Sequence, residues 1–179
     1  MANLYEYEGV APTLGKGVWL APTATIIGRA TLGDEVSVWF GAVVRADQLA
    51  IEIGARTNIQ DNAVVHITQE APIAPGLGTR IGAGVTVGHG AIVHACSIGD
   101  HVLVGMGSIV LDGAKIGNDV IIAAGTVVPP GMVVPDGMVV MGNPGRIKGP
   151  VTDDKRFWSH TAAGLYVGYA QKFRGSGIG

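Results

Sequence analysis

Residues 98–140 read IGDHVLVGMGSIVLDGAKIGNDVIIAAGTVVPPGMVVPDGMVV, and an aliphatic side chain returns at every sixth position of this stretch. A period of six does not fit an amphipathic α-helix, whose apolar face returns about every 3.6 residues. Glycine often follows the aliphatic residue, and glycine suits tight corners of the chain. The pattern predicts a parallel β-helix in which each hexapeptide makes one short strand and one corner, and three hexapeptides make one triangular coil. The aliphatic positions are Ile98, Val104, Val110, Ile116, Ile122, Val128, Val134 and Val140.

The same period extends toward the N-terminus and covers most of the chain, which predicts an all-β solenoid of about six coils within residues 1–148. Three extra residues separate Val44 from Ile53. Ten extra residues separate Val65 from Ile81, and prolines and glycines among them predict a surface loop at 68–79. The earlier aliphatic positions are Leu20, Ile26, Leu32, Val38, Val44, Ile53, Ile59, Val65, Ile81, Val87 and Val93.

Residues 149–179 leave the repeat, and the spacing of their apolar residues becomes helical. Thr152 can cap a helix, and Asp153 and Asp154 suit its first turn. We expect a C-terminal α-helix over residues 152–173 that folds back along the β-helix or onto a neighbouring chain. Its expected apolar stripe consists of Phe157, Leu165, Tyr166 and Tyr169.

The composition excludes several classes of protein. Lys and Arg number 12 against 14 Asp and Glu, a net charge of −2 that lacks the basic footprint of a nucleic-acid-binding protein. No apolar run reaches the roughly 18 residues of a membrane-spanning helix. The N-terminus has no basic start followed by an apolar stretch, and the single cysteine excludes an internal disulfide. We therefore expect a cytoplasmic protein with no membrane or nucleic-acid partner.

Counting coils along the repeat places three of the five histidines. His66 follows Val65 and His94 follows Val93, and these two valines lie one full coil apart. Adjacent coils are about 4.8 Å apart, so the two imidazoles point outward one above the other and can reach one ion. His89 falls on the preceding face of the triangle, where it does not easily share an ion with His94 of its own chain. We therefore expect a homotrimer in which a neighbouring chain supplies the third histidine.

Four other polar residues fall on the same two outward stacks. Counting by the repeat, Arg45 lies one coil before His66, and Asp61 lies one coil before His89. These two would meet across the trimer interface, either within the site or as an ion pair that only holds the trimer together. The four residues are Arg45, Asp47, Gln60 and Asp61, of which Asp47 can share Arg45.

Three imidazoles with an open fourth position are the ligand set of a catalytic zinc site. Zinc lowers the pKa of bound water to about 7, which yields a metal-bound hydroxide at neutral pH. Gln60 and the carboxylates of Asp47 and Asp61 would orient the ligands and the bound water without binding the metal themselves. Zn2+ suits three nitrogens and water, but Fe2+ or Co2+ would also bind there.

The histidines together with the arginine and the Gln-Asp pair resemble the gamma-class carbonic anhydrase family. The resemblance implies a left-handed parallel β-helix, with His66 and His94 from one chain and His89 from its neighbour. It implies reversible hydration of CO2 to bicarbonate and a proton (carbonate dehydratase activity), with Gln60 holding the metal-bound water or bicarbonate. It extends from about residue 10 to the C-terminal helix, where relatives also have a tyrosine near Tyr166. The matching segments are VRAD at 44–47, NIQD at 58–61, His66, and HGAIVH at 89–94.

The sequence departs from the family prototype at two positions. The prototype carries proton-shuttling glutamates where this chain has Gln48 and Gln69, which cannot shuttle protons. The alternative function is therefore a metal-binding relative with little CO2 hydration, acting in thioester hydrolysis or as a scaffold. A CoA-dependent acyltransferase needs a single general-base histidine, so three histidines disfavour that function.

Four more residues have ordinary structural explanations. Cys96 occupies an inward small position of the repeat and is expected in the core. His101 is expected at a solvated corner, and His160 on the helix, at its surface or at an interface. Tyr166 can approach the site from the helix or pack in the core, and both possibilities stay open.

Overall fold

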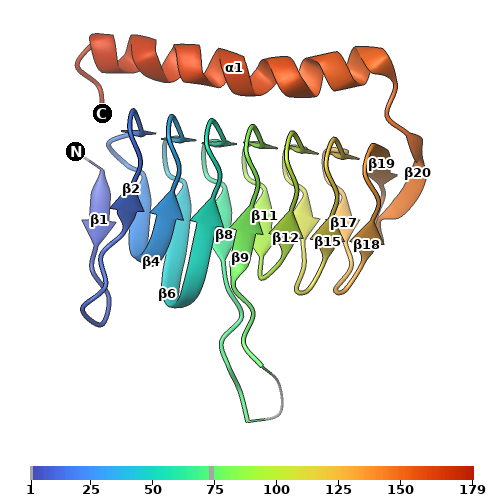
Figure 1. The fold of residues 1–179 in the computed structure, drawn as a ribbon, viewed down its shortest axis with the longest axis horizontal. Helices are drawn as coiled ribbons and strands as arrows, with labels where there is room; N and C mark the ends of the chain where they lie inside the picture. The colour runs from blue at the N-terminus through green and yellow to red at the C-terminus, as the bar shows by residue number, and fades with distance from the viewer. Residues whose placement is uncertain (1, 73–74) are drawn as a thin grey trace.

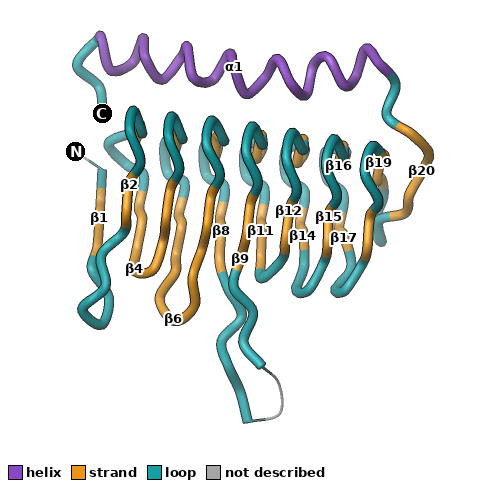
Figure 2. The backbone as a smooth tube through the Cα atoms, in the orientation of Figure 1, coloured by secondary structure: helices purple, strands orange, loops and turns teal. Residues whose placement is uncertain are grey.

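The computed structural model describes residues 2–72 and 75–179, which form a parallel β-solenoid of about eight turns with one long C-terminal helix (Figure 1, Figure 2). This confirms the predicted fold class. The short strands of successive turns stack in parallel, while the helix runs along one side and a hairpin projects from the opposite side. Residues 73 and 74 of the predicted loop lie outside the described residues. No helix within the described part of the chain is long and apolar enough to cross a membrane.

One sheet provides two faces of the triangular solenoid, because β4 and β6 continue around the corner between them. The first part of β6 pairs with β8 and its last part pairs with β9. The first face continues through β11, β14 and β17, and the second through β12, β15 and β18. The strands of this sheet are β1 (Asn3–Tyr5), β2 (Thr13–Leu14), β4 (Thr25–Leu32), β6 (Val43–Ile53), β8 (Val64–His66), β9 (Thr79–Ile81), β11 (Ile92–His94), β12 (Ser97–Ile98), β14 (Ile109–Val110), β15 (Lys115–Ile116), β17 (Val127–Val128) and β18 (Val133–Val134).

A second sheet provides the third face. Its strands pair in parallel and in chain order except for the last, which returns antiparallel to the strand before it. They are β3 (Trp19–Leu20), β5 (Ser37–Val38), β7 (Asn58–Ile59), β10 (Thr86–Val87), β13 (Leu103–Val104), β16 (Ile121–Ile122), β19 (Met138–Met141) and β20 (Arg146–Pro150).

The core consists of the aliphatic ladder that the period of six predicted. Every predicted position except the half-buried Leu20 is buried, and most have no exposed surface. In-register pairs such as Val44 with Val65, and Val65 with Val93, place one aliphatic side chain directly on the next. Burial of each such side chain stabilises the fold by roughly 1.5–3 kcal/mol.

The solenoid has about eight turns, whereas the sequence repeat predicted about six. The additional winding begins at the N-terminus, where β1 and β2 both pair in parallel with β4. Residues of β1 and β2 are exposed, so they lack the buried aliphatic residues from which the turns were counted.

The two insertions in the repeat are accommodated in different ways. The three extra residues between Val44 and Ile53 lengthen β6, and the pairing of β4 with β6 shifts register after Gly28. The ten extra residues leave the solenoid as a hairpin whose base is an antiparallel bridge between Thr68 and Leu77. The first insertion thus keeps the stack continuous, while the second projects from it.

Helix α1 (Asp153–Gly175) folds back along its own solenoid, one of the two placements expected from the sequence (Figure 1). Thr152 is the N-cap residue, but its side chain makes no capping hydrogen bond. The predicted apolar stripe is wrong in part: Phe157, Leu165 and Tyr169 are exposed. The buried residues of the helix itself are small, which lets the helix approach the turns closely; they are Ser159, Ala163 and Ala170.

The close stacking of turns predicts a strong effect of adding one methyl group at Gly54. A Cβ there would lie 2.5 Å from the carbonyl carbon of Gly82, which is backbone and cannot move aside. We expect Gly54→Ala to lower the free energy of unfolding by about 1–3 kcal/mol or more. Gly168→Ala is the matched control, because Gly168 lies in α1 with no atom within 4 Å of an added Cβ. Thermal unfolding of both variants measures the difference, and equal melting temperatures would contradict this account of the stacking.

Candidate metal site

His66 and His94 lie side by side on neighbouring turns, as the repeat predicted. They are paired in register at the ends of β8 and β11, and their ring centroids are 5.3 Å apart. Arg45 is in register with His66 one turn earlier. The corner between the first and second faces therefore presents an arginine and two imidazoles in a row.

The oxygen contacts of the three candidate ligands leave the same nitrogen of each ring available. Nδ1 of His66 lies 2.7 Å from the carbonyl oxygen of Arg45, and Nδ1 of His94 lies 2.6 Å from Oδ1 of Asp112. Nδ1 of His89 lies 2.8 Å from Oδ2 of Asp61. Carbonyl and carboxylate oxygens accept hydrogen bonds, so Nδ1 of His66 and of His94 donates and Nε2 retains its lone pair, and the contact with Asp61 favours the same tautomer for His89. Histidines that ligate a metal have this arrangement, so the residues present fit a divalent cation.

His89 lies on a different part of the surface. It follows β10 on the third face, beside a groove of about 340 Å3 whose wall is mainly aliphatic and includes Gln60. Gln60 is 5% exposed, and its amide nitrogen donates to Oδ1 of Asn58 over 3.1 Å. Within the described residues of one chain, no three His, Cys, Asp or Glu side chains are grouped to hold a metal ion. That a neighbouring chain supplies the third histidine stays a prediction.

Arg45 and Asp47 form an ion pair within one chain. The other carboxylate oxygen of Asp47, Oδ1, is buried without a hydrogen-bond partner and lies 4.0 Å from Nδ1 of His66. A buried acceptor without a donor costs about 1–3 kcal/mol. Asp61 is bonded to His89 in the single chain, so its predicted meeting with Arg45 across an interface stays a prediction.

Asp112 is a member of the site that the sequence analysis did not find. One of its oxygens accepts from His94, and the other accepts from the hydroxyl of Thr68 at the base of the hairpin. Burial alone would raise the pKa of Asp112, but the hydrogen bonds from Thr68 and His94 hold this pKa below its ordinary value. The repeat could have located Asp112, because this residue follows Val110 by two positions and Val110 lies one turn beyond Val93.

Tyr166 packs edge-on against Trp39, with ring centroids 5.1 Å apart, and belongs partly to the core. Burial raises the pKa of its phenol, and the nearby charge of Asp61 and the ring of Tyr169 raise it further. The phenol is therefore protonated at neutral pH, and it lies within electrostatic reach of the carboxylate that holds His89.

Cys96 is buried, as predicted, and burial raises the pKa of its thiol to about 12. A thiol of that pKa is not a nucleophile near neutral pH. His101 and His160 stack on each other with ring centroids 4.4 Å apart, and Nε2 of His160 lies 2.6 Å from Asp119. This second histidine pair joins the helix to the solenoid.

Gln48 and Gln69, which stand where the family prototype has glutamates, are both exposed. Two glutamates lie near them in the sequence. Glu70 is also exposed, and Glu52 faces Arg80 with 3.8 Å between Oε2 and Nε.

Removal of the Asp112 carboxylate should weaken zinc binding without unfolding the protein. We expect Asp112→Ala to lower zinc affinity about tenfold or more, because His94 loses the acceptor that fixes its ring. Asp112→Asn should lie between Asp112→Ala and the unchanged protein, since an amide oxygen still accepts from Nδ1 but carries no charge. Competition with a chromophoric chelator measures the affinities. Asp100→Ala is the control, because Asp100 also sits at a corner but bonds the amide of Ala83; equal affinity in all four proteins would rule out this role.

Comparison with known proteins places the chain among hexapeptide-repeat proteins. The family model "Bacterial transferase hexapeptide (six repeats)" matches residues 95–130. A solved structure, of a hexapeptide transferase family protein from Anaplasma phagocytophilum, superposes with a TM-score of 0.89 at 36% identity. That alignment covers 96% of this chain and 98% of the other.

Two similar proteins carry names that state an activity. The chain is 40% identical to "Carbonic anhydrase" of Geobacillus kaustophilus over 84% of this chain and 80% of that protein. It is 38% identical to "Gamma carbonic anhydrase 2, mitochondrial" of Arabidopsis thaliana over 90% of this chain. The match spans only 58% of the length of the Arabidopsis protein.

Proposed function

The chain belongs to the gamma carbonic anhydrase family, and we propose that it catalyses the reversible hydration of CO2 to bicarbonate at metal sites between subunits. The observation that carries this proposal is the common state of the three histidines. In each, Nδ1 faces an oxygen atom of the same chain, by a hydrogen bond for His66 and His94 and by an ion-pair contact for His89, which leaves Nε2 for a metal, as in metal-ligating imidazoles. Histidines that only pack in the core or face solvent would not need to share this arrangement of their ring nitrogens.

His66 and His94 of one chain and His89 of its neighbour would hold the metal, which we propose to be Zn2+. A zinc ion bound by three imidazoles acts as a Lewis acid and lowers the pKa of water to about 7. Asp112, Asp61 and the carbonyl oxygen of Arg45 hold the three rings in the required tautomer. An oxygen atom of the protein therefore lies against Nδ1 of each of the three imidazoles.

A homotrimer is the assembly that this site needs. His66 and His94 lie at one corner of the triangle and His89 at another, so threefold symmetry brings unlike corners together three times. The groove beside His89 is mainly aliphatic, and Met106 in its wall is 58% exposed. On the other face Ile92, two residues before His94, is 36% exposed. Two apolar surfaces next to the histidines support a contact between chains there.

The remaining polar residues have roles that follow from their contacts. Gln60 is held by Asn58 and can orient water or bicarbonate with its amide. Asp47 fixes Arg45, whose guanidinium can bind the anionic product. Asp61 keeps the proton on Nδ1 of His89, and the protonated phenol of Tyr166 can donate toward the same region. Gln48 and Gln69 cannot carry the released proton away, so solvent must accept it.

The cytoplasm remains our proposal for the compartment. It rests on the single cysteine, which is a buried free thiol. The Arabidopsis relative carries the word mitochondrial in its name.

Stopped-flow CO2 hydration tests the activity directly. We expect the zinc-loaded protein to accelerate hydration and the chelated protein to fall to the uncatalysed rate. His94→Ala should lose the acceleration, while His160→Ala should keep it, since His160 contacts Asp119 and His101 and none of the three candidate ligands. Zinc binding through the histidines without CO2 hydration would instead favour a metal-binding relative with another reaction, such as thioester hydrolysis. Gln48 and Gln69 are the residues of the sequence that favour this alternative.

Mixing two inactive variants tests whether the site lies between chains. His66→Ala and His89→Ala each remove one ligand from every site. In trimers refolded from an equal mixture, an interface with both intact surfaces forms in about one quarter of cases, because each surface is intact in half of the chains. We expect about a quarter of the original zinc content to survive dialysis. No recovery of zinc in the mixture would refute an interchain site.

A further inference from the structure

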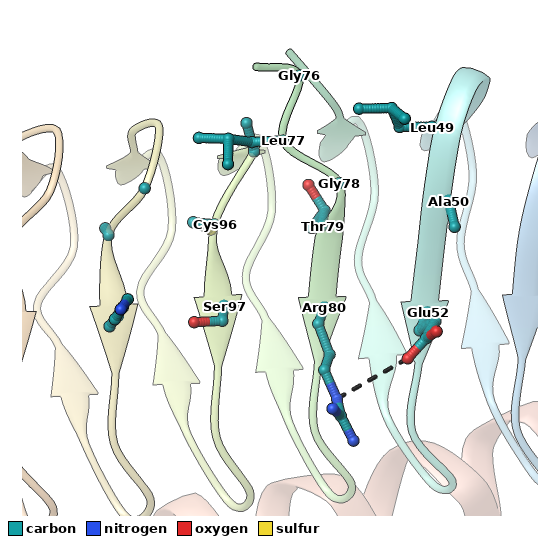
Figure 3. Close-up of a pocket in the computed structure, with 14 residues that line it drawn as sticks. Leu49, Ala50, Glu52, Gly76, Leu77, Gly78, Thr79, Arg80, Cys96 and Ser97 are labelled. Atoms are coloured by element: carbon teal, nitrogen blue, oxygen red, sulfur yellow. Dashed lines mark ion pairs between the residues drawn. The ribbon is translucent and has the colours of Figure 1, made fainter. Parts of the chain in front are cut away.

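A pocket of about 520 Å3 lies on the second face of the solenoid, beneath the base of the hairpin (Figure 3). Four strands form its floor, and in-register pairing places Glu52, Arg80, Ser97 and Lys115 next to one another across β6, β9, β12 and β15. This face carries none of the three candidate metal ligands. We take this face to be open in the proposed trimer, so the inference rests on the proposed arrangement of the chains.

The lower part of the pocket has positive charge. Neighbouring strands are about 4.8 Å apart, so the backbones of Arg80 and Lys115 lie on either side of Ser97, and their long cationic side chains can turn toward one small anion. Among the described residues that line the pocket, Glu52 is the one acidic residue, and its Oε2 lies 3.8 Å from Nε of Arg80. Both side chains of this pair are mostly exposed, 62% for Glu52 and 78% for Arg80, so the pair is weak and an anion can compete with it.

The upper part of the pocket is apolar. Leu49 from β6 and Leu77 from the hairpin lie above the charged row (Figure 3). A Cβ at Gly76 would lie 2.6 Å from Cδ1 of Leu49, so the absence of a side chain there lets the hairpin pack on this leucine. Small residues complete the wall on the side of β12 and β15, namely Ala95, Gly113 and Ala114.

We propose that this pocket binds an amphipathic anion, a carboxylate with a short alkyl chain. The carboxylate would lie between Arg80 and Lys115 and accept a hydrogen bond from Ser97, and the alkyl chain would lie against Leu49 and Leu77. The thiol of Cys96 in the wall is buried, which raises its pKa to about 12, so it is not a nucleophile for the bound anion near neutral pH. The proposal does not depend on the CO2 chemistry, because no candidate metal ligand lines the pocket.

Ligand-observed saturation-transfer NMR on the full chain tests this site with hexanoate as the probe. We expect saturable binding of hexanoate, weaker binding of acetate, which lacks the chain, and none of hexylammonium, which has the opposite charge. Carboxylates also bind zinc, so the titration is repeated after chelation, and binding at this pocket must persist. Hexylammonium binding as strong as that of hexanoate, or loss of hexanoate binding on chelation, would overturn the proposal.

Variants assign the binding to this pocket. Arg80→Gln and Lys115→Gln should each weaken hexanoate binding about fivefold or more, and Leu77→Ala should weaken hexanoate but not acetate. Arg56→Gln is the matched control: its side chain is 57% exposed and faces Glu35 at 4.0 Å, as Arg80 faces Glu52, but it lies at another corner. Unchanged affinity in Arg80→Gln, or equal losses in Arg80→Gln and Arg56→Gln, would show that the pocket is not the site.

Discussion

Each turn of the solenoid lies directly on the turn before it, and the register of that parallel pairing fixes where every functional side chain lies. Val44, Val65 and Val93 form one continuous inward ladder. The residue after each valine must then point outward, because successive side chains of a strand alternate between its faces. A slip of one residue would bury the histidines and expose the valines, so the aliphatic core protects the site geometry.

The proposed metal site uses this rigidity and adds oxygen atoms at its edges. The stack brings His66 and His94 together, but their ring orientations come from the carbonyl oxygen of Arg45 and the carboxylate of Asp112. Asp112 is held in turn by Thr68, at the point where the hairpin leaves the stack. The regular repeat therefore supplies position, and the irregular insertion supplies part of the orientation.

The features that depend on the period of six could be predicted from the sequence. The buried aliphatic residues and the register of His66 with His94 followed from counting alone. The N-terminal turns did not, because the strands there are exposed and carry no buried ladder residue. The helix face was predicted from large apolar residues, whereas close packing selected Ala163 and Ala170. Asp112 was missed because the corner residues, two positions after each valine, were not followed through the turns.

The position of the site within the stack has a consequence for how the molecule fluctuates. In a solenoid each turn contacts only its neighbours, so opening begins at the two ends and spreads inward. The turns that carry β8 and β11 lie near the middle, with several turns on either side (Figure 1). We therefore expect amide hydrogens around His66 and His94 to exchange with solvent more slowly than those of the outer turns. On this expectation, fraying of the N-terminal strands would leave the pair of histidines in place.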